Sequence, residues 1–240
     1  MTQKTALITG ASRGLGQVLA DFLAKQGYRL ILNARGAEAL EQATANLRTY
    51  TDVIALPGDI TDASHRQALA QAVGDGLDLL INNASTLGPS PQPTLALYPL
   101  DALCEVYEAN VFAPVALIQE TLPLLKARGG LVINLSSDAA VGGYAGWGGY
   151  GSSKAALDLV TKTLAQELAG TGVSVVSVDP GDMRTQMHQE AFPGEDISDR
   201  PLPEVTLPFW AWLLGQDGQD LTGQRFKAQA DTWTLAEVSA

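Results

Sequence analysis

Short apolar segments alternate along the chain with longer amphipathic segments. Each short segment is apolar almost without interruption, which is typical of a parallel strand buried on both faces. The longer segments carry apolar residues at helical spacing. The predicted strands are Thr5–Thr9, Arg29–Asn33, Val53–Leu56, Leu77–Asn82, Leu131–Leu135, Val173–Val178 and Gln224–Ala228. The predicted helices are Gly14–Gln26, Glu38–Leu47, His65–Val73, Asp101–Arg128 and Tyr150–Ala169.

This alternation of strand and helix predicts an α/β protein: a single-domain Rossmann fold with a doubly wound, parallel, seven-stranded sheet flanked by helices on both faces. No linker, repeat or low-complexity segment divides the 240 residues, so we expect residues 1–240 to form one domain. The proline-rich segment Gln186–Pro208 departs from the pattern and is predicted to be a loop. Because it follows a strand on the side where such sheets bind ligands, we interpret residues 186–208 as a substrate loop or lid, with a plain surface connection as the alternative.

The net charge of −11 excludes one class of partner. Nucleic acids bind clustered Lys and Arg, and the chain has no basic cluster. The single cysteine, Cys104, allows neither an internal disulfide nor a Cys/His metal framework, so no metal is expected. We expect Cys104 to be buried as a small apolar residue. The chain has no signal-peptide pattern and no uncharged apolar stretch of about 18 residues, which favours a cytoplasmic protein without membrane contact.

Glycines cluster directly after the first predicted strand. Glycine lets a pyrophosphate approach the backbone, and the start of the following helix offers free N–H groups and a partial positive charge. Because a strand precedes the cluster and a helix and a second strand follow it, the pattern predicts a dinucleotide-binding turn rather than a purely structural one. The predicted cofactor contacts in this turn are Gly10, Ser12, Arg13, Gly14, Leu15 and Gly16.

The residue after the second predicted strand indicates which dinucleotide binds. In Rossmann sites an acidic residue there binds the ribose 2′-hydroxyl of NAD, whereas an arginine accepts the 2′-phosphate of NADP. The chain has Arg35 at this point, and Arg13 lies in the glycine turn. Guanidinium groups suit bidentate recognition of phosphate, so we expect NADP(H) to be preferred over NAD(H). The alternative is that one or both arginines are only solvated surface residues.

Tyr150 and Lys154 stand four residues apart at the start of a predicted helix, which places them on one face. A nearby ammonium favours phenolate and lowers the pKa of tyrosine toward the range useful for proton transfer. The predicted strand Leu131–Leu135 delivers Ser137 to the same edge of the sheet. These residues predict a site for proton exchange with a substrate.

Together these motifs resemble the short-chain dehydrogenase/reductase family over nearly the whole chain. Two departures from the family pattern are Ser85, which replaces a glycine, and Asp138, which follows the catalytic serine and is expected to point away from the site. The positions that match are Thr9, Gly10, Gly14 and Gly16 of the glycine motif; Asn82, Asn83 and Ala84 after the fourth strand; Asp59 and Ile60 beside the adenine; Asn110, Ser137, Tyr150 and Lys154 of the active site; and Pro180, Gly181 and Thr185, with Met183 between them, at the nicotinamide carboxamide.

The resemblance implies that a hydride passes between NADP(H) and a carbonyl or alcohol substrate, with reduction of a ketone or aldehyde as the first expectation. It implies that Tyr150 donates the proton, that Lys154 holds the nicotinamide ribose and lowers the pKa of Tyr150, and that Ser137 binds the substrate oxygen. Asn110 would order a water that connects Lys154 to solvent. The alternatives are a dehydrogenase that oxidises a secondary alcohol with the same residues, and a non-catalytic NADP-binding regulator.

Three further side chains near the expected site are candidates for substrate contact. Trp147 and Tyr144 lie in a glycine-rich stretch before Tyr150, and His188 lies in the expected lid. The resemblance also implies a homodimer or homotetramer built through the two long helices. The alternative is that the same chain covers their apolar faces.

Overall fold

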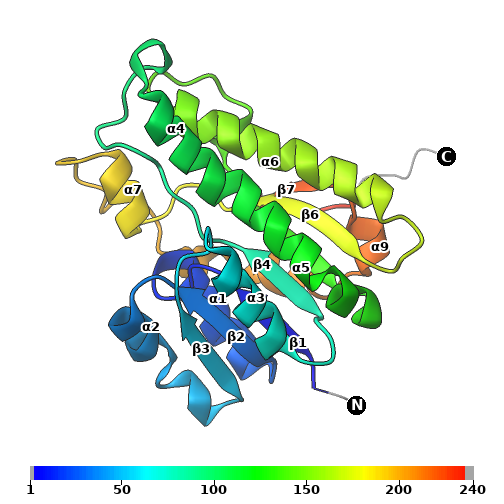
Figure 1. Ribbon diagram of the computed structural model, residues 1–240. Helices are drawn as coiled ribbons and strands as arrows, with labels where there is room; N and C mark the ends of the chain where they lie inside the picture. Colours follow the sequence, from blue (N-terminus) through cyan, green and yellow to red (C-terminus); the bar gives the residue numbers. More distant parts are fainter. Residues whose placement is uncertain (1–2, 236–240) are drawn as a thin grey trace.

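Parallel β-strands form the centre of the molecule (Figure 1). The computed structural model describes residues 3–235. The strands lie in the order β3-β2-β1-β4-β5-β6-β7, and every neighbouring pair is parallel. Their bounds are β1 (Thr5–Ile8), β2 (Arg29–Ala34), β3 (Val53–Pro57), β4 (Leu79–Asn82), β5 (Leu131–Leu135), β6 (Ser174–Asp179) and β7 (Arg225–Lys227).

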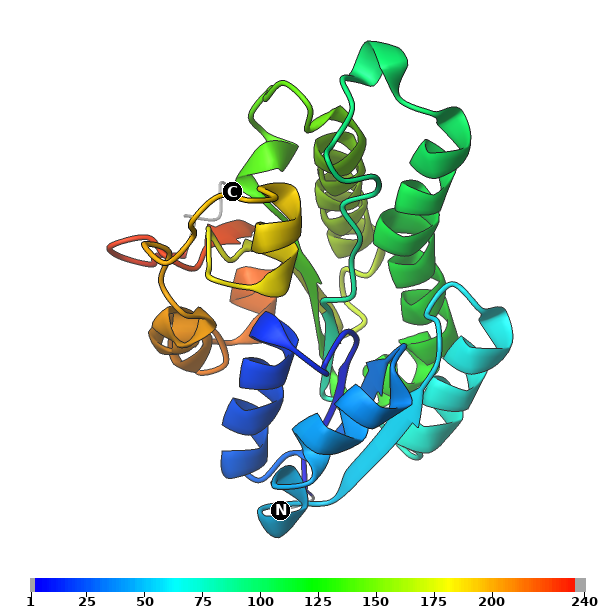
Figure 2. The ribbon, with the colours of Figure 1, turned by 90° about the vertical axis from the view of Figure 1, so that its left-hand side faces the viewer.

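Helices cover both faces of this sheet (Figures 1 and 2). One apolar cluster packs α1 and α8 against one face, and a second packs α3 and α5 against the other. The helices are α1 (Gly14–Lys25), α2 (Ala37–Thr44), α3 (Ala63–Val73), α4 (Leu100–Tyr107), α5 (Ala113–Arg128), α6 (Gly148–Glu167), α7 (Gln186–Ala191), α8 (Leu207–Leu213) and α9 (Gly218–Leu221). The predicted doubly wound fold class is confirmed.

The strand order reverses between β1 and β4, and this reversal locates the ligand-binding edge. From β1 the chain proceeds outward through β2 to β3, and then returns to β4 on the other side of β1. The connections therefore diverge at the carboxyl ends of β1 and β4 and leave a crevice, which is where open α/β sheets bind ligands. The segments that follow β1, β4, β5 and β6 all meet at this edge.

Two predictions about local structure were wrong, and a third lacked one detail. The expected helix Asp101–Arg128 is present as an unbroken helical run, but the π-helical turn Glu108–Phe112 lies within it, between α4 and α5. Part of the expected loop Gln186–Pro208 is helical, because it contains α7 and the 3-10 turn Pro203–Thr206, and α8 begins at its end. Such short helices carry too few apolar turns to show a period in the sequence. Cys104, expected to be buried, is exposed on α4.

Between residues 3 and 235, none of the helices has the length and apolar composition needed to cross a bilayer. The same range holds no group of three or more His, Cys, Asp or Glu side chains arranged to bind a metal ion.

Candidate active site

The turn between β1 and α1 follows a path that depends on glycine. Gly10 and Gly14 have φ values of 68° and 56°, in the left-handed region that side chains disfavour. A side chain at Gly16 would overlap the Gly10 carbonyl oxygen and the Asn83 amide. Arg13 caps α1 in an extended conformation, and no side chain in the described structure caps that helix start. Free N–H groups beside a side-chain-free turn fit the pyrophosphate of a dinucleotide.

The chain after β4 is fastened to this glycine turn by Thr9 and Asn83. The backbone N–H groups of Asn83 and Ala84 each donate to the Thr9 hydroxyl at 3.0 Å. The Asn83 amide donates to the carbonyl oxygens of Thr9 at 2.9 Å and Gly10 at 3.0 Å. The predicted cofactor residues of β1 and β4 are therefore held together as one surface.

Asp59 and Arg35 lie close together after β3 and β2. Asp59 accepts hydrogen bonds from the backbone N–H of Thr61 at 2.9 Å and from its hydroxyl at 2.8 Å. Partial burial acts to raise the pKa of Asp59, but these hydrogen bonds and the charge of Arg35 outweigh it and lower that pKa. The Arg35 side chain is exposed, and Ile60 beside Asp59 is buried. This is the arrangement expected around the adenosine end of a dinucleotide.

Arg13, the second predicted phosphate ligand, is linked to α7. Its guanidinium donates to the side-chain oxygen of Gln186 and lies 3.9 Å from a carboxylate oxygen of Glu190. The sequence analysis did not anticipate this contact, because it treated Gln186 and Glu190 as part of a loop. The glycine turn is thus joined to the segment expected to act as a lid.

Tyr150 and Lys154 lie in the first turns of α6, and both are almost fully buried. The Lys154 ammonium donates to the Leu135 carbonyl oxygen at 2.8 Å, and its Nζ lies 5.5 Å from the centroid of the Tyr150 ring. Burial lowers the pKa of Lys154 to about 8.

The expectation that Lys154 lowers the pKa of Tyr150 was wrong for this structure. Burial raises the pKa of Tyr150 above its ordinary value, although hydrogen bonds with Ser85 and Ser137 oppose the rise. Desolvation disfavours the charged phenolate, and the ammonium is turned toward strand β5 instead of the phenol oxygen.

Ser137 follows β5 and is bonded to its neighbour Asp138. The Ser137 hydroxyl donates to Asp138 Oδ1 at 3.1 Å and accepts from the Ala139 N–H at 3.1 Å. The expectation that Asp138 points away from the site was therefore wrong. The 3-10 turn Asp138–Ala140 brings the carboxylate round to the serine, and a hydrogen bond with the same carboxylate raises the pKa of Tyr144.

Asn110 lies in the π-helical turn, fully buried. Its Oδ1 accepts from the Ser85 hydroxyl at 3.0 Å and from the Thr86 N–H at 2.8 Å. Its Nδ2 donates to the Thr86 carbonyl oxygen at 2.9 Å and to the Ser153 hydroxyl at 3.0 Å. The side chain thus joins the segment after β4 to α6, and the serine that departs from the family pattern is part of that junction.

A cavity of about 480 Å³ opens beside these groups. Trp147 packs edge to face against Tyr150, with ring centroids 5.9 Å apart, and lies 5.8 Å from the Phe192 ring. His188 sits on α7 with its Nδ1 3.8 Å from Asp182. The structure thus brings the three predicted substrate contacts to the cavity that Ser137 and Tyr150 line. All three are among its lining residues, which also include Leu87, Pro180, Gly181, Met183, Thr185, Met187, Ala191 and Phe192.

The sequence analysis missed several of these lining residues. Met187, Ala191 and Phe192 belong to or adjoin α7, where the prediction placed only a loop. The side chain of Thr185 begins that helix by accepting from the His188 N–H at 3.2 Å. A threonine directly before the segment, in the position of a helix N-cap, is the signal that would have indicated α7.

Comparison with known proteins agrees with this geometry. Residues 4–196 match the family model for short chain dehydrogenases. The chain is 36% identical over 222 residues to the rhamnolipids biosynthesis 3-oxoacyl-[acyl-carrier-protein] reductase of Pseudomonas aeruginosa, covering 87% of this chain and 83% of that protein. It is 37% identical over 186 residues to a serine 3-dehydrogenase of Rhizobium radiobacter, covering 76% and 73% of the two chains.

A solved structure extends the agreement to three dimensions. A short chain dehydrogenase from Shigella flexneri 2a, complexed with NADP, superposes with a TM-score of 0.86 at 31% identity, covering 96% of this chain and 98% of that one. The fold and site define a Rossmann-type oxidoreductase. The chain belongs to the short-chain dehydrogenase family, whose members act on an alcohol or carbonyl group with a nicotinamide cofactor.

Proposed function

We propose that the protein is an NADPH-dependent carbonyl reductase that reduces a ketone or an aldehyde to the alcohol. One observation carries the proposal: Tyr150 and Ser137 line the same cavity, and Lys154 Nζ lies 5.5 Å from the centroid of the Tyr150 ring. The NADP in the Shigella flexneri structure, together with Arg13 and Arg35 in this chain, supports NADP(H) over NAD(H).

The proposed mechanism assigns one task to each group at the reacting oxygen. The nicotinamide of the bound cofactor supplies the hydride. Tyr150 donates its phenolic proton to the substrate oxygen, while the Ser137 hydroxyl binds the same oxygen as charge develops on it. Lys154, held in place by the Leu135 carbonyl oxygen, would bind the nicotinamide ribose. The Asn110 side chain already uses all four of its hydrogen-bonding positions within the protein, so the water through which the Tyr150 proton is replaced would have to be held by the Asn110 backbone.

The raised pKa of Tyr150 favours reduction over the oxidative alternative. A proton donor must be protonated at the working pH, and burial keeps this phenol protonated well above neutrality. Oxidation of a secondary alcohol needs the phenolate as its base, which the same burial disfavours. The serine 3-dehydrogenase among the relatives is named for the oxidative direction, so that reaction stays the second candidate.

The lining of the cavity supports a small, partly apolar substrate. We propose that Trp147, Tyr144 and His188 contact it, and that residues 186–208 act as its lid within a single domain spanning residues 1–240. The link from Arg13 to Gln186 and Glu190 supports a lid that adjoins the cofactor site. The remaining cofactor contacts are those expected from the sequence: Gly10, Ser12, Gly14, Leu15, Gly16, Asp59, Ile60, Asn83, Ala84, Pro180, Gly181, Met183 and Thr185.

The proposal includes a cytoplasmic homodimer or homotetramer. Two apolar side chains on the surface of the long helices support association: Phe112 is 52% exposed and Leu159 is 66% exposed. Burial of such side chains in a subunit interface would remove apolar area from water. Sedimentation that shows only a 25.2 kDa species at micromolar concentration would contradict the oligomer.

The experiment follows NADPH absorbance with a panel of ketones, aldehydes, quinones and β-keto thioesters. Tyr150→Phe is measured in parallel, and its turnover is expected to fall at least ~100-fold, the usual contribution of a general acid. A Tyr150→Phe protein that keeps most of the activity would exclude the assignment. Tight NADPH binding without turnover on any carbonyl would favour a non-catalytic NADP-binding regulator.

A further inference from the structure

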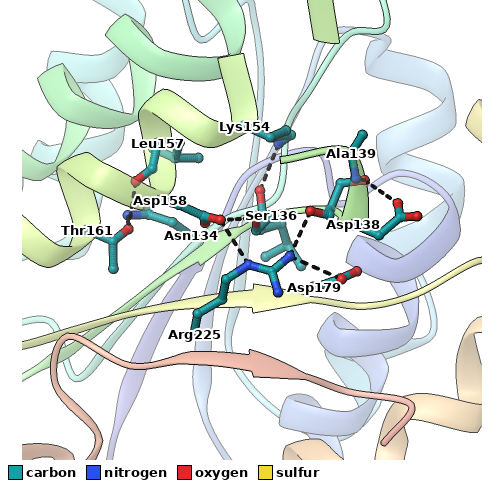
Figure 3. A network of polar contacts seen from close by, with 12 residues as sticks. Asn134, Ser136, Asp138, Ala139, Lys154, Leu157, Asp158, Thr161, Asp179 and Arg225 are labelled. Atoms are coloured by element: carbon teal, nitrogen blue, oxygen red, sulfur yellow. Dashed lines mark hydrogen bonds and ion pairs between the residues drawn. The ribbon is translucent and has the colours of Figure 1, made fainter. Parts of the chain in front are cut away.

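The face of α6 that carries Tyr150 and Lys154 continues for one more turn to Asp158. Residues four apart lie on one side of a helix, so all three side chains lie on the side of α6 that faces the end of β5. Lys154 donates to the Leu135 carbonyl oxygen at 2.8 Å, and Asp158 Oδ2 accepts from the Ser136 hydroxyl at 2.8 Å (Figure 3). The helix therefore holds Leu135, the last residue of β5, and Ser136, which follows it.

Arg225, on strand β7, holds the third residue in this row. Its Nη2 donates to the Ser137 carbonyl oxygen at 2.7 Å and to Asp179 Oδ2 at 3.2 Å, and its Nε donates to Asp158 Oδ2 at 2.9 Å (Figure 3). The side chains of Arg225, Asp158 and Asp179 are 16%, 11% and 6% exposed. A planar guanidinium reaches three acceptors at once, which a lysine ammonium on a flexible stem does not reproduce.

Each of the three residues from Leu135 to Ser137 is thus bound by a different charged side chain, Leu135 and Ser137 through their carbonyl oxygens and Ser136 through its hydroxyl. Leu135 is held by Lys154, Ser136 by Asp158, and Ser137 by Arg225. The hydroxyl proposed to bind the substrate oxygen and the ammonium proposed to hold the ribose are both fixed relative to this row. An error of about 1 Å in such placement costs about 100-fold in rate.

We propose that Asp158 and Arg225 are positioning residues of the reaction, which fix the end of β5 so that Ser137 and Lys154 keep their places beside Tyr150. Asp158 lies one helical turn after the motif Tyr-x-x-x-Lys, and Arg225 on β7 binds it from the neighbouring strand. This proposal rests on the function proposed above for Ser137, Tyr150 and Lys154.

The pair also sets the electrostatics around Lys154. Burial lowers the pKa of Lys154 to about 8, and the Asp158 carboxylate opposes that effect. Tyr150 and Asp158 on α6 act directly beside the ammonium. Asp138 after β5 and Asp179 on β6 act on Tyr150, and Arg225 on β7 pairs with Asp158 and Asp179.

Two variants should therefore move the pKa of Lys154 in opposite directions. Asp158→Asn removes the negative charge that opposes the effect of burial on Lys154. The pKa of Lys154 should therefore fall below about 8. Arg225→Met leaves the buried carboxylates Asp158 and Asp179 without their cation, so the pKa of Lys154 rises. A general loss of packing in the two variants would not move this pKa in opposite directions.

The test measures kcat and KM against pH for NADPH-dependent reduction in both variants. We expect kcat to fall about ten-fold or more in each. We expect the alkaline limb of the pH profile to move to lower pH in Asp158→Asn and to higher pH in Arg225→Met. The matched control is Glu120→Gln, in the partly buried Arg66–Glu120 pair between α3 and α5, which should change neither quantity.

A second readout needs no turnover. The side-chain NMR signal of Lys154, in protein with labelled lysine and assigned with Lys154→Met, reports its titration in the cofactor-free protein. The two variants should shift this titration in the same opposite directions as the activity profile.

Two charge-conserving variants cover the case in which the first pair fails to fold. Asp158→Glu and Arg225→Lys keep both charges but lose the three-point geometry, so kcat should fall and the alkaline limb should stay in place. Folded Arg225→Lys protein with wild-type kcat would overturn the proposal. If Tyr150→Phe abolishes turnover while all four variants keep wild-type kcat, only the positioning role is wrong; an active Tyr150→Phe protein would instead overturn the proposed function.

Discussion

Lys154 lies one turn of α6 after Tyr150, yet its ammonium binds the Leu135 carbonyl oxygen at 2.8 Å and not the phenol oxygen. The lysine is therefore anchored to the central sheet, and burial governs the ionisation of both side chains. Burial lowers the pKa of Lys154 to about 8 and raises the pKa of Tyr150. In this state the tyrosine is protonated and the lysine is mostly charged at neutral pH, as the proposed reduction requires.

The first prediction concerns the alkaline limit of activity. The ammonium form of Lys154 predominates below about pH 8 and is lost as the pH rises through that value, while Tyr150 remains protonated. The kcat/KM of NADPH-dependent reduction should therefore fall with one ionisation near pH 8. An activity plateau that extends to the ordinary pKa of lysine, about 10.4, would contradict this prediction.

The second prediction concerns Ser85, where the family has glycine. Its hydroxyl bonds Asn110 at 3.0 Å and also bonds Tyr150, where it opposes the rise of the Tyr150 pKa. Ser85→Gly should raise that pKa and move the rising limb of alcohol oxidation about one pH unit to the alkaline side, because a hydrogen bond to a charged group contributes about 1.5–3 kcal/mol. Reduction at neutral pH should change little.

Ser85→Ala distinguishes the effect of losing the hydroxyl from the effect of a more flexible backbone. It removes the same hydrogen bonds without the flexibility of glycine, so both variants should shift the limb equally. A shift in Ser85→Gly alone would mean that backbone freedom, and not the hydroxyl, affects Tyr150.

The third prediction concerns cofactor preference. Arg35 is exposed at the carboxyl edge of the sheet, where its charge already acts on Asp59. Arg35→Asp should weaken NADPH binding about ten-fold or more, since it replaces a charge-assisted hydrogen bond of about 1.5–3 kcal/mol with repulsion. Fluorescence titration with NADPH and NADH measures the preference. Arg48→Asp makes the same charge change on a remote surface and should leave it unaltered.

The fourth prediction concerns the glycine turn. An alanine side chain at Gly16 would overlap the backbone carbonyl oxygen of Gly10, so the backbone must move. Gly16→Ala should lower the free energy of unfolding by about 1–3 kcal/mol and weaken NADPH binding. Denaturant unfolding measures the first effect. Gly36→Ala is the control, because its added side chain would meet only the Ala39 Cβ at 3.8 Å.

The sequence by itself determined the sheet, its flanking helices and the residues at its carboxyl edge. Strand and helix periods are local properties, and the glycine turn, Ser137 and the Tyr150–Lys154 pair are each defined within a few residues of a strand or helix end. That is why α1, α6 and the strands β1 to β7 were predicted within about two residues of their bounds. The sequence did not predict the short helix α7 or the π-helical turn around Asn110, because neither spans enough residues to show a period.

Only the tertiary structure decided how these groups are oriented and ionised. Arg225 is 67 residues from Asp158 and 88 from Ser137, so no local pattern indicated their contact. The inward turn of Asp138 depends on a 3-10 turn, and the raised pKa of Tyr150 depends on burial by segments from the whole sheet edge. Burial and long-range hydrogen bonds arise from packing of distant segments, and they decide which protonation state of each proposed catalytic group is present.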